Sequence, residues 1–308
     1  MNEEGISICI TAYHVEKYIK DCLDSVVNQT WFKTHNDWEI IVGVDGCEKT
    51  LSQLKTIMHN YKNLRVFMMD SNNGTYITSN TIMSNATYEN IFRFDGDDIM
   101  YPELVEKIMT MKGSCSCVRY LMKNFGGNTN VGTAHGTMYI KKSIFLKYGG
   151  FRPWVCGADT EIHHRLKHIE NTKDLKEILM LRRVHEDSLT NRKETDMKSE
   201  KRKEYIRFIK NEVISKPEDA IIQCITSTYK EVTSPLEGTV DKDLYLSQIN
   251  LKSYMKNIEV YTVDDKKIEK VENKSKTVNT IKKLREDINT GKVIQVPTLN
   301  GFIWKRVK

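Results

Sequence analysis

The chain has 308 residues, enough for one large domain or for a domain of about 200 residues with a smaller attachment. Its 39% apolar and 29% charged residues are ordinary for a soluble globular protein, and the net charge of +6 is modest. No run of residues approaches the roughly 18 consecutive apolar residues of a membrane span, so we expect no transmembrane segment.

The N-terminus and the cysteines indicate a cytoplasmic protein. The chain begins with Met-Asn-Glu-Glu and continues directly into a strand-like run, so we expect no signal peptide. The seven cysteines are scattered and most lie in apolar runs, which is typical of reduced, buried thiols. We therefore expect a cytoplasmic location. Two variants of this location are also compatible with the sequence: attachment to a membrane surface, and the host cytoplasm if the protein is viral.

Strand-like and helix-like segments alternate through the first half of the chain. The expected strands are Ile6–Thr11, Glu39–Val44, Leu64–Met69 and Ile91–Phe94. The expected helices between them are Glu16–Val27, Leu51–Tyr61 and Thr75–Ser84. This βαβα order predicts an α/β fold with a mainly parallel sheet flanked by helices on both faces.

The second half of the chain is less regular. The expected elements are a loop at Phe125–Thr133, strands at Thr137–Ile140 and Leu179–Val184, and helices at Ala158–His168 and Glu194–Ile214. We predict a first domain over residues 1–215 and a small C-terminal domain of unknown role over residues 216–308, an α/β or helical appendage. Its expected elements are strands at Ala220–Thr226 and Ile258–Val263 and helices near Leu244–Met255 and Thr277–Ile288.

Polar residues follow each of the four N-terminal strands. They are Thr11-Ala12-Tyr13, Asp45-Gly46, Asp70-Ser71-Asn72 and Asp95-Gly96-Asp97-Asp98. In open α/β sheets, ligands bind beyond the carboxyl ends of the strands. We therefore predict that these four strand ends form the functional site.

The acidic run at the fourth strand end suggests a metal site. Three carboxylates within Asp95–Asp98 repel one another unless a cation lies among them. Carboxylates separated by a glycine can hold Mg²⁺ or Mn²⁺ and leave positions for phosphate oxygens. A capped turn is the structural alternative, because Asp and Gly are also turn residues.

Six short motifs follow one another between about residues 5 and 191 of the chain. They are Ile6–Tyr13 with Val26–Thr30, Trp38–Gly46, Asn73-Gly74 with Asn80, Phe94–Asp98 with Pro102, Gly157–Arg165, and Leu181–Thr190. Together they resemble the family 2 glycosyltransferases. The resemblance implies the GT-A fold, a Rossmann-like nucleotide-diphospho-sugar transferase fold, with a metal-binding DxD motif and an inverting reaction.

The resemblance also implies the residues that bind the sugar donor. Asp45 would accept a hydrogen bond from the donor base, with a UDP-sugar as the expected donor, and Thr11, Tyr13 and Asn80 would line the same pocket. Asp95 would contact the ribose or the metal. These residues would then form one donor site.

The chemistry implied by the resemblance needs a cation and a base. Asp97 would be the principal ligand of Mn²⁺ or Mg²⁺, and His185 would complete the metal or diphosphate site from across the cleft. The cation would stabilise the departing nucleoside diphosphate. Asp159 would take the proton of the acceptor hydroxyl, and Glu161 is the alternative base.

Several residues depart from the family pattern. His14 stands where the family usually has Asn, and Gly43 replaces an acidic or apolar residue. Ser79 lies where a basic residue commonly helps to bind the donor, and Ala158 replaces the Glu of a Glu-Asp pair. Trp154, in the loop before Asp159, is either a stacking platform for a sugar or an ordinary packing residue.

The acceptor and the activity leave alternatives open. The family's usual acceptors are saccharides and lipid-linked glycans, and less often proteins. The stretch 192–210, with eight Lys/Arg against four Asp/Glu, would also suit a phage or viral enzyme that glycosylates a modified DNA base. The loss of the acidic neighbour at Ala158 leaves an inactive sugar-nucleotide-binding protein as a further alternative. A nucleotidyltransferase is disfavoured, because Thr11–Lys17 is no Gly-rich, basic phosphate loop.

Overall fold

The computed structural model describes residues 4–111, 113–123, 129–167, 169–175, 177–183, 185, 188–216, 219, 221–234, 261–264, 267–270, 293–298 and 301–306. Within these residues, no helix is long and apolar enough to cross a lipid bilayer.

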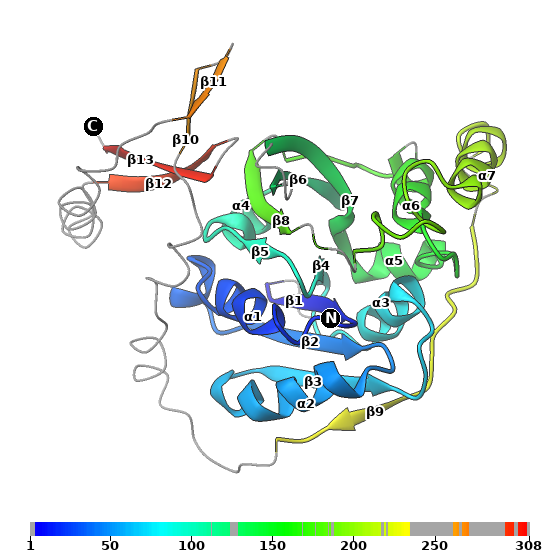
Figure 1. Cartoon of the computed structure of the whole chain (residues 1–308), viewed down its shortest axis with the longest axis horizontal. Coiled ribbons are helices and arrows are strands. Elements are labelled where there is room, and N and C mark those ends of the chain that lie inside the picture. Colours follow the sequence, from blue (N-terminus) through cyan, green and yellow to red (C-terminus); the bar gives the residue numbers. More distant parts are fainter. Residues whose placement is uncertain are drawn as a thin grey trace.

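A nine-stranded sheet forms the centre of the molecule (Figure 1). Its strands are β1 (Ile6–Ala12), β2 (Trp38–Val44), β3 (Leu64–Met69), β4 (Asn90–Asp95), β5 (Ile99–Met100), β6 (Cys115–Lys123), β7 (Thr129–Lys141), β8 (Ile178–Arg183) and β9 (Tyr229–Val232). They lie in the order β5-β8-β6-β7-β4-β1-β2-β3-β9. The central strands β4, β1, β2 and β3 are parallel, whereas β7 and β9 run antiparallel to their neighbours β4 and β3. The sheet is therefore mixed, and the predicted parallel arrangement holds for its N-terminal half.

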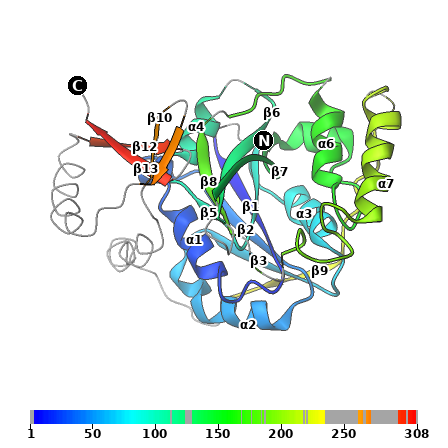
Figure 2. The same ribbon diagram turned by 45° about the horizontal axis from the view of Figure 1, so that its top comes forward.

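Helices cover both faces of this sheet (Figure 2). They are α1 (Ile19–Val27), α2 (Glu48–Ile57), α3 (Thr75–Ser84), α4 (Leu104–Thr110), α5 (Lys142–Tyr148) and α6 (Ala158–Lys167). A seventh helix, α7 (Glu200–Phe208), lies beyond α6 and buries none of its residues. Short 3₁₀ turns occupy Trp31–Lys33 and Met58–Asn60, and a π-helical turn, Ile209–Val213, continues α7.

Two apolar cores lie on opposite sides of the central strands. Ile6, Ile8 and Ile10 of β1 pack with α1 and α2, while Cys9 between them packs with α3, α5 and α6. Every residue of β1 is buried, because side chains that alternate along a strand meet a helical layer on each face. The predicted α/β architecture of the first half is confirmed.

Gly43 explains how closely α3 approaches the sheet. A Cβ atom at this position would come within 2.8 Å of the methyl carbons of Thr78 and Ile82 on α3. No other residue fits there without moving the helix, so the departure at Gly43 matches a close helix–strand contact.

Several predicted elements differ from the structure. The helix expected at Glu16–Val27 begins at Ile19, and the helix expected at Leu51–Tyr61 spans Glu48–Ile57. Residues 221–228, which include most of the expected strand Ala220–Thr226, have no regular structure, and the strand follows them as β9. The charged helix begins at Glu200 instead of Glu194, because Ser199 caps it by accepting a hydrogen bond from the Arg202 amide. The expected loop Phe125–Thr133 gives way to β7 from residue 129 onward.

The C-terminal part contains two further antiparallel strand pairs, β10 (Tyr261–Asp264) with β11 (Lys267–Lys270) and β12 (Val293–Thr298) with β13 (Gly301–Arg306). β10 overlaps the expected strand Ile258–Val263. The helices predicted near Leu244–Met255 and Thr277–Ile288 lie outside the described residues.

The described cysteine side chains are all free thiols. Cys9, Cys22, Cys47 and Cys156 are buried, and Cys224 is half-buried. For these five residues the prediction of reduced thiols, mostly buried, is confirmed.

Candidate functional site

A cleft of about 770 Å³ opens at the carboxyl ends of the central strands. Seven of the nine predicted site residues line it: Thr11, Tyr13, Asp45, Asp95, Asp97, Asp159 and His185. They come from the ends of β1, β2 and β4, from the start of α6 and from the loop after β8. The topology thus brings together residues that are up to 174 positions apart in the sequence (11 to 185).

Asp97 and His185 meet across the cleft. The distance from His185 Nε2 to Asp97 Oδ2 is 2.9 Å. The His185 ring is buried and lies 4.9 Å, centroid to centroid, from the ring of Tyr18, which restricts its orientation. A carboxylate beside an imidazole nitrogen is a ligand pair that fits a divalent cation.

Asp95 faces a buried arginine. Its Oδ1 lies 2.7 Å from Nη2 of Arg93, a β4 residue whose side chain is almost fully buried. The same Nη2 donates to the hydroxyls of Thr11 at 3.0 Å and Thr75 at 2.7 Å. Arg93 Nε donates to Ser79 Oγ at 3.1 Å, so a guanidinium lies beside the position where the family pattern has a basic residue. Arg93 is not among the predicted site residues, although a charged residue inside the apolar run Ile91–Phe94 was a signal of a special role.

Asp98 connects the acidic turn to β8. Its Oδ1 accepts the backbone amide of Arg183 at 2.8 Å. Burial, followed by the charges of Asp97 and Asp95, raises the pKa of this carboxyl well above its usual value. Asp98 therefore fixes the turn that presents Asp97.

The carboxylate of Asp45 binds the backbone of the turn that precedes α3. Its two oxygens accept the backbone amides of Asn73 at 2.8 Å and Gly74 at 3.0 Å. Burial raises the pKa of Asp45, and these hydrogen bonds offset only part of that rise. Each carboxylate oxygen keeps a second acceptor position, so a donor base can still bind at this edge of the cleft.

Asp159 lies in the first turn of α6, where a helix N-terminus favours a negative charge. The hydroxyl of Tyr76 donates to Asp159 Oδ1 at 2.8 Å and accepts the amide of Gly157 at 3.0 Å. Gly136 lies against the other side, because a Cβ there would come within 3.4 Å of Asp159 Oδ2. One carboxylate oxygen is thus held by Tyr76, while the half-buried side chain still reaches the cleft.

Asn80 and Glu161 do not line the cleft. The Asn80 amide donates to the carbonyls of Phe151 and Ile225 at 2.9 Å each and accepts the amide of Phe151 at 2.9 Å. Glu161 is fully buried and pairs with Arg165 at 2.9 Å and Arg152 at 3.0 Å. Both side chains join segments of the fold, which corrects the predicted donor-binding role of Asn80 and the alternative base role of Glu161.

Several arginine side chains line the cleft. They are Arg182, Arg183, Arg192 and Arg202, in addition to Arg93. Arg192 lies with its guanidinium carbon 6.0 Å from the ring centroid of Tyr13. Guanidinium groups match the geometry of phosphate oxygens, so the cleft is suited to a diphosphate.

Trp154 is a packing residue. Its ring stacks on Tyr205 of α7 with centroids 4.2 Å apart and planes 2° apart, and the edge of Phe208 lies against it. Because Tyr205 covers one face of the indole, the packing alternative of the sequence analysis holds in the structure.

Two stacked histidines, one from β7 and one from α6, border the cleft. The rings of His135 and His163 stack with centroids 4.4 Å apart, and His135 lines the cleft. Burial, followed by the nearby His135, lowers the pKa of His163 to about 4. His163 therefore stays neutral through most of the acidic range.

The pKa of His163 predicts an acid-sensitive fold. An unfolded histidine has a pKa of about 6.5, so between pH 6.5 and pH 4 the unfolded chain binds a proton that the folded chain does not. The free energy of unfolding should fall as the pH falls through this window and level off below it. His163→Gln should remove part of this dependence in urea unfolding at pH 7 and pH 4.5. The exposed His35, changed to Gln, is the control, and equal slopes for both variants would contradict the prediction.

The fold of this site is that of known nucleotide-sugar enzymes. TarS 1–349 of S. aureus in complex with UDP-GlcNAc superposes with a TM-score of 0.55 and 17% identity, over 82% of this chain and 73% of that chain. The mannosyltransferase PcManGT of Pyrobaculum calidifontis, in complex with GDP-Man and Mn²⁺, gives a TM-score of 0.50 and 12% identity, over 71% and 74%. The chain therefore has the GT-A fold.

Sequence comparison identifies the family that resembles it. Residues 7–145 match the model described as Glycosyl transferase family 2. An uncharacterized glycosyltransferase of Haemophilus influenzae is 33% identical over 106 residues, which cover 34% of this chain and 32% of that protein. A chondroitin synthase of Pasteurella multocida is 34% identical over 102 residues, or 33% and 10%. The chain thus matches a third or less of the length of these relatives, and the matches support a transferase of the glycosyltransferase class.

Proposed function

We propose that this chain is a metal-dependent glycosyltransferase that transfers a sugar from a nucleotide-sugar donor to an acceptor hydroxyl with inversion. The observation that carries the proposal is the gathering of the Asp97–His185 pair and Asp159 in one cleft at the strand ends of a GT-A fold. One part of the cleft can hold the leaving group, and another can take a proton.

The donor is a UDP-sugar. Thr11, Tyr13 and Asp45 form the wall against which the base would lie, and the arginine side chains that line the cleft would bind the diphosphate. The TarS structure holds UDP-GlcNAc in the same fold, which supports this nucleotide, while the GDP-Man complex marks GDP-sugars as the comparison to test.

Asp97 and His185 would hold Mn²⁺ or Mg²⁺. When bound there, the cation supplies Lewis-acid stabilisation of the charge that grows on the departing diphosphate. The neighbouring carboxylate Asp95 is oriented by Arg93, which leaves it able to accept a hydrogen bond from a donor hydroxyl. The Mn²⁺ in the mannosyltransferase complex supports a divalent ion.

Asp159 is the general base of the proposed reaction. Tyr76 and Gly136 fix its position, and Oδ2 is the oxygen that would accept the proton of the attacking hydroxyl. A carboxylate that serves as a base for direct attack, opposite the leaving group, gives inversion at the anomeric carbon.

The acceptor is a saccharide, as part of a free or lipid-linked glycan or of a glycosylated protein. The names of the relatives, chondroitin synthase and the O-antigen biosynthesis glycosyltransferase WbnJ of Escherichia coli (23% identical over 210 residues, 59% of this chain and 81% of that protein), support a saccharide. The alternative of a DNA acceptor rested on the basic stretch 192–210. In α7 that stretch pairs Lys201 with Glu204 and Lys203 with Glu200, so its helical part presents charges of both signs.

The proposal is tested with the purified chain and a panel of UDP-, GDP- and TDP-sugars. Released nucleoside diphosphate is measured with Mn²⁺ and with EDTA. We expect slow hydrolysis of one donor that EDTA abolishes and that Asp97→Ala lowers by at least about 100-fold, because the variant lacks a metal ligand. Glu48→Ala, on the surface of α2, is the control.

The same measurements separate the alternatives. Donor binding without any turnover would point to the inactive sugar-nucleotide-binding protein. A steep loss of duplex DNA binding with rising salt would point to the DNA acceptor. Hydrolysis that is equal in EDTA, or unchanged in Asp97→Ala, would contradict the metal-dependent mechanism.

A further inference from the structure

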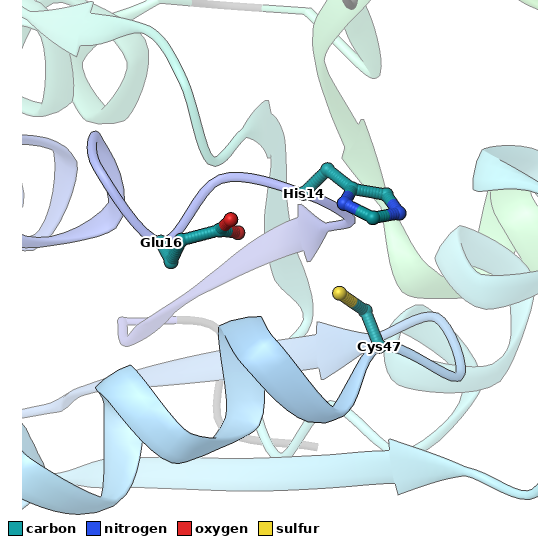
Figure 3. Close-up of side chains that lie close together, drawn as sticks. All are labelled: His14, Glu16 and Cys47. Carbon is teal, nitrogen blue, oxygen red and sulfur yellow. The ribbon is translucent and has the colours of Figure 1, made fainter.

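Three side chains of different chemistry meet at the first two strand ends, beside the donor wall of the cleft. His14 and Glu16 lie in the loop between β1 and α1, and Cys47 is the residue before α2. One ligand atom from each, an imidazole nitrogen, a carboxylate oxygen and the thiol sulfur, lies within 4.8 Å of the others. Figure 3 shows the three side chains directed into one common space. In the described part of the chain this is the one group of three or more such ligand atoms gathered so closely.

The backbone at His14 is unusual. Its φ angle is 55°, in the left-handed region that few residues other than Gly adopt, with Asn, Asp and His the most frequent exceptions. Such conformations persist where the surroundings hold them, and they concentrate at functional sites. Here the conformation brings the imidazole over Cys47 and leaves its outer edge exposed to solvent, so an ion could enter from that side.

Cys47 supplies the sulfur atom of the group. A thiolate is the form of cysteine that binds metals. The side chain is 4% exposed, which protects it from solvent on the side away from His14.

Thr50 orients the carboxylate ligand. Its hydroxyl donates to Glu16 Oε2 at 3.3 Å and accepts the backbone amide of Val15 at 3.2 Å. A hydrogen bond from a neighbour that is not itself a ligand is the usual way in which proteins hold metal-binding carboxylates in place. The residue before α2, Cys47, is therefore one ligand, and Thr50 in the first turn of α2 aligns a second.

We propose that His14, Glu16 and Cys47 form a second metal site, which takes Zn²⁺. A thiolate with an imidazole selects a softer ion than the Mg²⁺ or Mn²⁺ that carboxylate oxygens prefer. One thiolate and one carboxylate balance the two positive charges of the ion, and a water fills the fourth position of the tetrahedron. Binding displaces the thiol proton to solvent and changes no oxidation state.

The site would tie the β1–α1 loop to α2. Tyr13, which lines the cleft, touches His14 edge-on with ring centroids 4.3 Å apart. Zinc at His14 would therefore hold the wall against which the donor base lies. The ion is distinct from the one proposed at Asp97 and His185, in its ligands and in its place in the fold.

The test uses the full chain, stripped of metal, with excess Mg²⁺ present to occupy oxygen-ligand sites. Co²⁺ is titrated in while the thiolate-to-cobalt charge-transfer absorption is recorded, and Zn²⁺ is then added. We expect one equivalent of Co²⁺ with this absorption, displaced by Zn²⁺. His14→Asn should weaken Zn²⁺ binding at least about 10-fold, and it should keep the fold because Asn tolerates the left-handed backbone.

Two further variants make the result specific. Cys47→Ser should abolish the absorption, while Cys224→Ser, at the half-buried cysteine, and Asp97→Ala should both behave as the unchanged chain does. The absence of any thiolate absorption in the unchanged chain overturns the proposal. So does absorption that survives Cys47→Ser, or Zn²⁺ affinity that is unchanged in His14→Asn.

Discussion

Asp159→Asn should lower kcat for sugar transfer by about 10²- to 10⁴-fold, because a placed general base contributes acceleration of that size. The amide keeps the shape of the carboxylate and can still accept the Tyr76 hydroxyl, so the folding of α6 and the binding of the donor should change little. Steady-state kinetics of sugar transfer measure the loss of kcat. The Kd for UDP, the product released from the donor, shows whether donor binding is unchanged.

Tyr76→Phe is the matched control for the base. It removes the hydroxyl that holds Asp159 Oδ1 and the amide of Gly157, but it leaves the carboxylate in the cleft. A smaller loss of kcat than in Asp159→Asn is expected, because the base loses its orientation and not its chemistry. Transfer that is undiminished in Asp159→Asn would remove this residue from the mechanism.

Glu161→Gln should lower the free energy of unfolding by about 3–5 kcal/mol, the usual result of breaking a buried ion pair from one side. Glu161 and its partner Arg165 are both 0% exposed, and Arg165 also donates to the carbonyls of Tyr148 and Gly150. The loss of the carboxylate charge leaves a buried guanidinium without its counterion. Urea unfolding monitored by circular dichroism measures the effect.

Activity per folded molecule separates the two acidic residues of α6. It should be retained in Glu161→Gln, because this side chain is not in the cleft, and lost in Asp159→Asn. Glu200→Gln, which removes an exposed ion pair with Lys203, should leave the unfolding midpoint unchanged. A stable, inactive Glu161→Gln protein would return Glu161 to the role of base.

The first half of the fold was predictable from local pattern. β3 and α3 have the predicted bounds, and β1, β2 and β4 extend them by one or two residues. These strands are buried on both faces, so their apolar runs are continuous, and polar residues mark the ends where the cleft opens. The same rule placed Thr11, Tyr13, Asp45, Asp95 and Asp97 in that cleft, and the family resemblance added Asp159 and His185.

The remaining features depend on contacts that no local pattern contains. Asn80 occupies a family-like position, but whether its amide meets a ligand or the backbone of Phe151 and Ile225 depends on where two distant loops run. Glu161 and Asp159 lie two residues apart on a helix, and only the packing of Arg165 decides which of them is buried. The pairing of β9 with β3 joins residues more than 150 positions apart, and its short, polar strand carries little signal.

The late return of the chain to the sheet has a consequence for shortened forms of this protein. The segment 221–232 runs beside α3 and ends on β3, as Figure 1 shows. The Ser227 amide donates a hydrogen bond to Thr81 of α3, and the Tyr229 hydroxyl donates one to Asn85, the residue after α3. A protein cut at residue 215, where the sequence suggests a domain end, would lack this cover. It would present the bare hydrogen-bonding edge of β3 to other copies, and such an edge is a template for strand-to-strand aggregation. The shortest form of the protein that does not aggregate in this way should therefore extend through Val232, beyond the point at which the regular βα alternation ends.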